Sequence, residues 1–312
     1  MGKPQRLVFG EALLELGGED ERIVVLDADV SSSTQTKHFA SRYPDRFFNV
    51  GVAEANMVSI AAGLASCGYI PFVSTFAFLL ALRAGDQVRA QVAYGQLNVK
   101  LMGGYAGLSD FADGASHQSV EDLAVMRALP NMTVIVPSDV TETRMAVRAA
   151  AGREGPVYVR LSRAEVTEDY GPGHPFEVGR GIVLREGEDA TFIATGTMVK
   201  TAMEAADVLA GEGFHMRVID MHTVKPIDKD IIVAAAHETG AIVTVEEHSI
   251  YGGLGSAVCE IACEHCPVPV FRCGIPDRFG ESGAYPEILR RAGLHAGRVA
   301  ELGRTAIAAR IW

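Results

Sequence analysis

The stretch NVGVAEANMVSIAAGLASCGYIPFVSTFAF, residues Asn49–Phe78, predicts a helix that leads into a buried strand and then into a small-residue loop. Apolar residues recur at helical spacing from about Gly51 onward. The run YIPFV at Tyr69–Val73 is short, apolar and aromatic, as buried strands are. The apolar helix positions are Ala53, Met57, Ile60, Ala61 and Leu64. A helix followed at once by such a strand is typical of α/β proteins.

Short β-branched runs alternate with helical patterns along the whole chain. This alternation predicts two doubly wound, three-layer α/β/α domains with mostly parallel sheets. The predicted strands are Arg22–Leu26, Tyr69–Val73, Asn98–Met102, Thr133–Val136, Pro156–Leu161, TFIAT from Thr191, HMRVID from His215, AIVTVEE from Ala241 and VPVFR from Val268. Helical patterns in the second half cover Lys200–Leu209 and Ile227–His237.

The length of the chain predicts two domains, because 312 residues exceed what one hydrophobic core normally supports. The segment Ala164–Gly181 concentrates Gly, Pro and charge without periodicity, as interdomain linkers do. We therefore place the first domain at residues 1–168 and the second at residues 182–312.

The charge balance argues against partners that require a basic surface. The formal net charge is -11 and the pI is near 5.3, so nucleic acid and anionic membrane surfaces are poor partners. The N-terminal sequence lacks the pattern of a secretory leader, and no uninterrupted apolar run approaches the length of a membrane span. These features predict a cytoplasmic protein.

Five cysteines form an odd set, which does not fit a secreted disulfide framework. Cys259, Cys263 and Cys266 have a spacing that is able to hold an iron–sulfur cluster. They lie in a helical pattern, GGLGSAVCEIACEHC, whereas a cluster requires a loop. We therefore interpret these cysteines as small apolar residues of a buried helix.

Several segments resemble those of transketolases, a family that depends on thiamine diphosphate. They are GVAEANM around Glu54, PFVSTFAF, DADVSSST, DGASHQSVEDLA, VIVPSD, RVIDMHTVKPID and VEEHSIYGGLGSAV, and together they extend over the whole chain. The resemblance implies the pyrimidine-binding and C-terminal domains of a split transketolase. It also implies a role in carbohydrate metabolism, the transfer of a two-carbon ketol unit from a ketose to an aldose.

The resemblance implies that Glu54 is catalytic and hydrogen-bonds the N1′ atom of the cofactor's aminopyrimidine. A carboxyl group buried beside an aromatic ring is able to share a proton with that nitrogen. Phe76, Phe78 and Leu79 follow in the loop expected to hold the same ring. Leu79 departs from the family, which has a phenylalanine there to stack on the pyrimidine, and the sequence leaves open whether Leu79 or Phe78 shields the ring.

The run DGASHQ places Asp113 and His117 at a predicted loop-to-helix junction. His117 resembles the transketolase histidine that contacts the carbonyl end of the substrate, and Asp113 is expected in the same site. An imidazole is able to donate to a developing alkoxide and to shuttle protons. The alternative is a structural histidine satisfied by Ser119 or by the backbone.

Arg6, Ser33 and Arg163 match the positions where transketolases bind the phosphate at the far end of the sugar. Guanidinium groups suit this task because they bind phosphate oxygens through two hydrogen bonds. The alternative for each arginine is a solvated side chain or a modest ion pair. Tyr105 stands where many transketolases have a histidine, so one possible cation is missing. Its phenol is still able to donate one hydrogen bond to a phosphate or sulfonate, so a phosphate or related anionic sugar stays open beside a less charged or differently shaped one.

The diphosphate site of the family is not found in this sequence. Thiamine enzymes hold the diphosphate through Mg²⁺ or Ca²⁺ bound by a GDG motif and a later Asn, and no GDG occurs here. The resemblance therefore implies an N-terminal partner subunit that carries the metal, with no metal ligand in this chain. Paired transketolase active sites imply a heterotetramer that acts on sugars or sugar phosphates.

Two other functions compete with this interpretation. The beta subunit of a 2-oxo acid dehydrogenase and a deoxyxylulose-phosphate-synthase-like enzyme share the domain plan, although STFAF, DGASHQ and DMHTVKPID favour transketolase. A non-catalytic assembly or regulatory subunit is the alternative from another class. Leu79 and Tyr105 support it, whereas retention of Glu54 and His117 opposes it.

Overall fold

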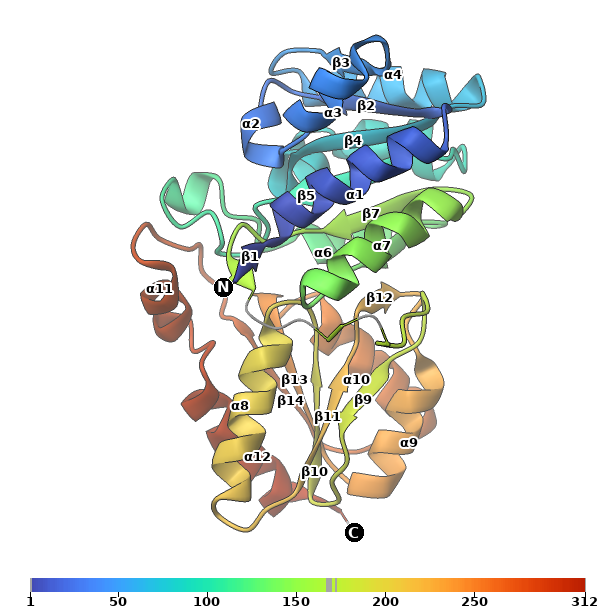
Figure 1. Ribbon diagram of the computed structural model, residues 1–312. Helices are drawn as coiled ribbons and strands as arrows, with labels where there is room; N and C mark the ends of the chain where they lie inside the picture. Colours follow the sequence, from blue (N-terminus) through green and yellow to red (C-terminus); the bar gives the residue numbers. More distant parts are fainter. Residues whose placement is uncertain (1, 167–169, 172, 312) are drawn as a thin grey trace.

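The computed structural model describes residues 2–166, 170–171 and 173–311, which form two large sheets flanked by helices (Figure 1). The predicted domain limits at residues 1, 168 and 312 lie outside the described residues, as do positions 167–169 and 172 of the predicted linker. The predicted fold class is confirmed, because each sheet is mainly parallel and carries helices on both faces.

The first sheet has seven strands, of which only the edge strand β12 is antiparallel to its neighbour. In spatial order they are β12 (Thr223–Lys225), β6 (Thr133–Ile135), β7 (Val157–Arg160), β5 (Lys100–Gly104), β4 (Ile70–Phe76), β2 (Ile23–Asp27) and β3 (Phe47–Asn49). Strand β12 comes from the second half of the chain, so the two halves share this sheet.

Helices cover both faces of the first sheet. One face packs against α4 (Glu54–Ser66), α6 (Asp122–Ala128) and the π-helical segments η2 (Leu79–Arg83) and η3 (Val88–Ala93). The other face packs against α1 (Gln5–Glu19), α3 (Lys37–Arg42) and α7 (Val140–Gly152). Shorter elements are α2 (Ser31–Thr34), η1 (Pro44–Arg46), α5 (Gly85–Gln87) and η4 (Gly114–Ser116), and β1 (Lys3–Pro4) pairs with β8 (Glu165–Val166).

The second sheet has five strands and the same layered construction. In spatial order they are β14 (Val270–Ile275), β13 (Ile242–Ser249), β10 (Ala190–Ala194), β11 (Met216–Asp220) and the antiparallel β9 (Ile182–Arg185). Helices α8 (Met198–Ala210) and α12 (Ala296–Ala309) cover one face, and α9 (Lys229–Thr239) and α10 (Leu254–His265) cover the other, with α11 (Tyr285–Arg291) at one end (Figure 1).

The predicted helix near Gly51 begins three residues later, at Glu54. Gly51 has a φ of 73°, in the left-handed region, so the chain turns there before the helix starts. Met57, Val58 and Ala61 then lie on the buried face of α4, which fixes Glu54 at its first position. None of the helices in the described part of the chain has both the length and the apolar character needed to cross a bilayer.

Candidate functional site

Four parallel strands of the first sheet deliver site residues to one edge. Strands β2, β4, β5 and β7 are neighbours, and their carboxyl ends meet at the same side of the sheet. Ser33, Phe76, Tyr105 and Arg163 lie at or just beyond these ends. In open α/β sheets, ligands bind outside the carboxyl ends of the strands. The sheet topology thus brings together residues that lie up to 130 positions apart, from Ser33 to Arg163.

Aromatic side chains form the centre of this edge. The rings of Phe76 and Tyr105 lie 4.6 Å apart, and the His117 ring lies 6.1 Å from Phe76 and 5.6 Å from Phe78. Tyr105 is buried and has a φ of 59°, a backbone conformation that bulky residues rarely adopt. Such local strain is concentrated at functional sites in proteins.

Two arginines contact Tyr105. Arg6 donates from Nη1 to the Tyr105 hydroxyl at 3.0 Å and to the Ser33 carbonyl oxygen at 3.2 Å. The Arg163 guanidinium lies 5.0 Å from the centre of the Tyr105 ring. The four residues assigned from the sequence to the far end of the substrate are therefore neighbours. Both arginines contact Tyr105, and Arg6 also contacts Ser33.

Arg163 is paired with a carboxylate that the sequence analysis missed. Its Nη1 lies 2.9 Å from Oδ1 of Asp110, whose side chain is fully buried. Burial and the neighbouring Asp113 raise the pKa of Asp110 to about 6. Asp113 is exposed and precedes η4, so Asp113 and Asp110 form an acidic pair beside Arg163. Arg163 therefore forms an ion pair in the structure, which is the alternative given for it in the sequence analysis.

His117 lies farther from a helix than predicted. It directly follows the short segment η4, and α6 begins only at Asp122. Its Nδ1 lies 2.9 Å from the Ser116 hydroxyl, so Ser116, not Ser119, is its side-chain neighbour. When Ser116 donates to Nδ1, the neutral ring carries its proton on Nε2.

Glu54 and Leu79, two of the residues predicted to hold the cofactor ring, are both buried. Glu54 is 1% exposed, and its Oε2 accepts a hydrogen bond from Arg83 Nη1 at 3.1 Å. Arg83 ends segment η2, which starts at Leu79 immediately after Phe78. The ion pair therefore connects Glu54 to the segment that begins with Leu79, one of the predicted cofactor contacts. Arg83 was not predicted, because nothing in the sequence indicates that it reaches Glu54.

The second domain supports the site through buried polar contacts. Glu247 accepts hydrogen bonds from the Leu108 amide at 2.7 Å and from the Tyr285 hydroxyl at 2.7 Å. Arg160 pairs with the buried Asp122 at 2.8 Å and also donates to the Glu247 carbonyl oxygen at 3.0 Å. These bonds fasten the loop after β5, which carries Asp110 and His117, to strand β13.

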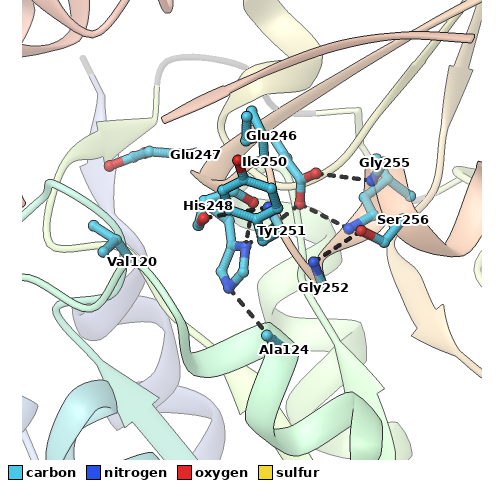
Figure 2. A network of polar contacts seen from close by, with 12 residues as sticks. Val120, Ala124, Glu246, Glu247, His248, Ile250, Tyr251, Gly252, Gly255 and Ser256 are labelled. Atoms are coloured by element: carbon cyan, nitrogen blue, oxygen red, sulfur yellow. Dashed lines mark hydrogen bonds and ion pairs between the residues drawn. The ribbon is translucent and has the colours of Figure 1, made fainter. Parts of the chain in front are cut away.

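Strand β13 also holds a buried carboxyl and imidazole side by side (Figure 2). Glu246 accepts hydrogen bonds from the Leu254 and Gly255 amides, at the start of α10. His248 Nε2 accepts a hydrogen bond from the Ala124 amide at 3.4 Å. Burial raises the pKa of Glu246 to about 7 and lowers the pKa of His248 to about 4.

The cysteine prediction is only partly correct. Cys259 and Cys263 lie in helix α10, and Cys266 caps it, so the helix is confirmed. Burial is wrong for all three, because Cys263 is exposed and Cys259 and Cys266 are only half-buried, and α10 covers the sheet with its opposite face. Within residues 2–166, 170–171 and 173–311, no group of three or more His, Cys, Asp or Glu side chains is arranged to hold a metal ion.

Known proteins share both halves of this chain. Residues 3–168 match the family model for the pyrimidine binding domain of transketolase, and residues 179–299 match that for the transketolase C-terminal domain. A protein of Methanocaldococcus jannaschii assigned as a transketolase C-terminal section is 46% identical over 96% of this chain and 95% of its own length. The 6-deoxy-6-sulfo-D-fructose transketolase subunit of a Clostridium species is 43% identical, over 93% of this chain and 90% of that subunit.

A solved structure has the same fold over nearly the full chain. The structure, described as a split gene transketolase in an inactive beta4 tetramer, is 48% identical and superimposes with a TM-score of 0.91, covering 99% of this chain and 100% of that one. The chain belongs to the transketolase family, whose members depend on thiamine diphosphate.

Proposed function

We propose that this chain is the subunit of a split transketolase that supplies the catalytic carboxyl group, Glu54. Assembled with a partner subunit, it would transfer a two-carbon ketol unit from a ketose to an aldose. The observation that carries the proposal is the buried Glu54, held in place by Arg83 next to the segment that begins at Leu79. Burying a carboxyl group is costly, so a fixed and buried one is a good candidate for a catalytic role.

The residues at this edge fit an aminopyrimidine ring. Such a ring needs a carboxyl group for one nitrogen and apolar surface on its face. Glu54 supplies the carboxyl group, and Leu79, Phe76 and Phe78 supply apolar surface. Thiamine diphosphate, when bound, would supply the carbon nucleophile that accepts and then releases the two-carbon unit.

The chain's own residues would bind the substrate and move protons. Glu54 would hold a proton at its buried carboxyl group. His117, with Nδ1 next to Ser116, would present Nε2 as a donor to the substrate oxygens near the reacting carbon. Asp113 would bind a sugar hydroxyl, and Arg6, Ser33, Tyr105 and Arg163 would orient the far end of the sugar.

A partner subunit would complete the site by binding the diphosphate and its Mg²⁺ or Ca²⁺. The absence of a GDG motif from this sequence supports this division. The relative described as an inactive tetramer of beta chains supports it too, because that protein, at 48% identity, is inactive in that assembly. Two copies of each chain would then give a cytoplasmic heterotetramer.

Glu54→Gln tests the proposal in the complex with a partner that carries GDG and its Asn. Glutamine keeps an acceptor for Arg83 but does not hold the proton. We expect ketol transfer to fall about 100-fold or more, since general acid–base residues contribute about 10²–10⁴. Sedimentation of the complex and thiamine diphosphate binding are measured in parallel, and assembly is expected to persist.

Glu212→Gln is the matched control, because Glu212 is a surface residue paired with Arg304. It is expected to leave ketol transfer unchanged. Full activity in the Glu54→Gln complex would remove Glu54 from the mechanism. A wild-type complex that assembles and binds the cofactor but transfers no ketol unit would favour the assembly-subunit alternative.

A further inference from the structure

Arg163 is held in place on three sides. Asp110 Oδ1 accepts from its Nη1 at 2.9 Å, and the rings of Tyr105 and Phe111 each lie 5.0 Å from the guanidinium carbon. The Asp110 side chain is fully buried, whereas that of Arg163 is 27% exposed. The carboxylate is therefore an internal counter-ion for Arg163, shielded from solvent by the surrounding protein.

Among the residues that the structure describes, Arg6 has no such counter-ion. Its Nη1 donates only to oxygens that carry no charge, the Ser33 carbonyl and the Tyr105 hydroxyl. Its Nε is buried and has no hydrogen-bond partner within the described residues. No carboxylate forms an ion pair with Arg6 in that same part of the chain. Arg6 thus keeps an uncompensated charge and an unused donor.

The charge at the far end of the site differs from that of a pair of free arginines. Arg6 and Arg163 contribute two positive charges, and Asp110 cancels one of them. Asp113 adds a further negative charge near Asp110. A monoanion is matched by the charge of Arg6, whereas the second charge of a phosphate dianion meets an Arg163 that Asp110 already neutralises. Like charges that meet in a partly buried site disfavour binding strongly.

We propose that Asp110 is a specificity-determining residue, which neutralises Arg163 and selects ketoses whose far end carries a single negative charge over sugar phosphates. This inference rests on the proposed function and names the substrate class of that site. A sulfonate is the matching group, because it has three acceptor oxygens like a phosphate but only one negative charge. The unused Nε of Arg6, the Ser33 segment and the Tyr105 hydroxyl would bind it.

The test compares three donors that differ only at carbon 6: 6-deoxy-6-sulfo-D-fructose, D-fructose 6-phosphate and D-fructose. The value of kcat/KM is measured for each with the complex and one fixed aldose, at about pH 7.5, where Asp110 is ionised. The wild-type complex is expected to prefer the sulfonate to the phosphate. Asp110→Asn keeps an acceptor for Arg163 but removes the charge, and should shift this ratio toward the phosphate by about tenfold or more.

Arg6→Gln is a second variant that does not depend on how Asp110→Asn folds. It should lower kcat/KM for the sulfonate by about tenfold or more relative to its effect on D-fructose, which carries no anionic group for Arg6 to bind. Asp20→Asn is the matched control, because it removes an acid paired with Arg22 on the surface, and the ratio should not move.

The outcomes separate this inference from the proposed function. A wild-type preference for the phosphate that Asp110→Asn leaves unchanged would overturn the role of Asp110. An equal loss for all three donors in Asp110→Asn would also overturn it, because Asp110 would then act only on structure. A complex that turns over no ketose at all would instead refute the proposed function.

Discussion

Arg83 donates from Nη1 to Oε2 of Glu54 at 3.1 Å, although the Arg83 side chain is 54% exposed and that of Glu54 only 2%. The buried carboxylate of Glu54 is therefore paired with a guanidinium group that is in contact with solvent. A double-mutant cycle with Glu54→Gln and Arg83→Gln should give a coupling free energy of about 0.5–1 kcal/mol, because solvent screens the exposed arginine. Urea unfolding of the four proteins measures it, and a coupling of zero would mean that Arg83 does not stabilise Glu54.

Asp122→Asn should destabilise the protein much more strongly. Burial would raise the pKa of Asp122, but the charge of Arg160 outweighs it and holds that pKa below its ordinary value. Removing the carboxylate charge leaves Arg160 buried without its counter-ion, which costs about 3–5 kcal/mol. Chemical denaturation measures the loss, and the surface change Asp20→Asn should cost about 0.5 kcal/mol or less. Similar losses for both variants would contradict this account.

Glu246 should make stability fall as pH rises. Its pKa is raised from 4.5 to about 7 in the folded state, so between these values the folded protein holds a proton that the unfolded chain has lost. The free energy of unfolding from this group therefore decreases with pH across that window, by about 3 kcal/mol in total. Glu246→Gln removes this pH dependence. It also lowers stability by an amount that does not depend on pH, because one hydrogen-bond acceptor at the start of α10 is lost.

The pH experiment compares Glu246→Gln with wild type at each pH. His248 contributes the opposite slope, since its lowered pKa makes stability rise between about pH 4 and 6.5. The part of this contribution that does not depend on Glu246, which lies 3.8 Å from the His248 ring, cancels on subtraction. The variant should gain stability relative to wild type between about pH 4.5 and 7. A constant difference over that range would show that Glu246 does not titrate there.

Gly280→Ala should loosen the loop that carries His117. A Cβ at position 280 would collide with Oε1 of the buried Gln118 and with the side chain of Leu108. Gln118 Nε2 donates to the Glu281 carbonyl oxygen at 3.0 Å, so the collision breaks a contact between the two domains. We expect a loss of about 1–3 kcal/mol and lower ketol transfer. In Gly152→Ala the new Cβ meets open space, and activity should be unchanged.

The sequence predicted the buried strands well and the edge strands poorly. All nine predicted strands are present, and eight of them lie inside a sheet, where apolar runs are covered on both faces; the ninth, β14, is an edge strand. The strands that were missed, β1, β3, β8, β9 and β12, have two to four residues. Such short strands exist through pairing with distant residues, as Thr223 does with Ile135, and local patterns do not reveal that pairing.

The site was predicted from motifs, but its charge partners were not. Phe76, Tyr105 and His117 lie together because Phe76 ends one strand and the other two residues follow the neighbouring strand. The order of the motifs in the sequence does not show this by itself; the resemblance to transketolases indicated it. Asp110 and Arg83 are ordinary charged residues in sequence, and only the fold brings them to Arg163 and Glu54. One signal for Asp110 was present: it precedes Asp113 by three residues in the same loop.

Ketol transfer by this chain, alone and mixed with a partner that carries GDG and its Asn, tests the central claim most directly. The assay contains thiamine diphosphate, Mg²⁺, a panel of ketoses and aldoses, and pyruvate as the donor expected for the competing enzyme classes. We expect transfer from a ketose in the mixture and none by the chain alone. Transfer by the isolated chain, or turnover of pyruvate but no ketose in the mixture, would contradict it.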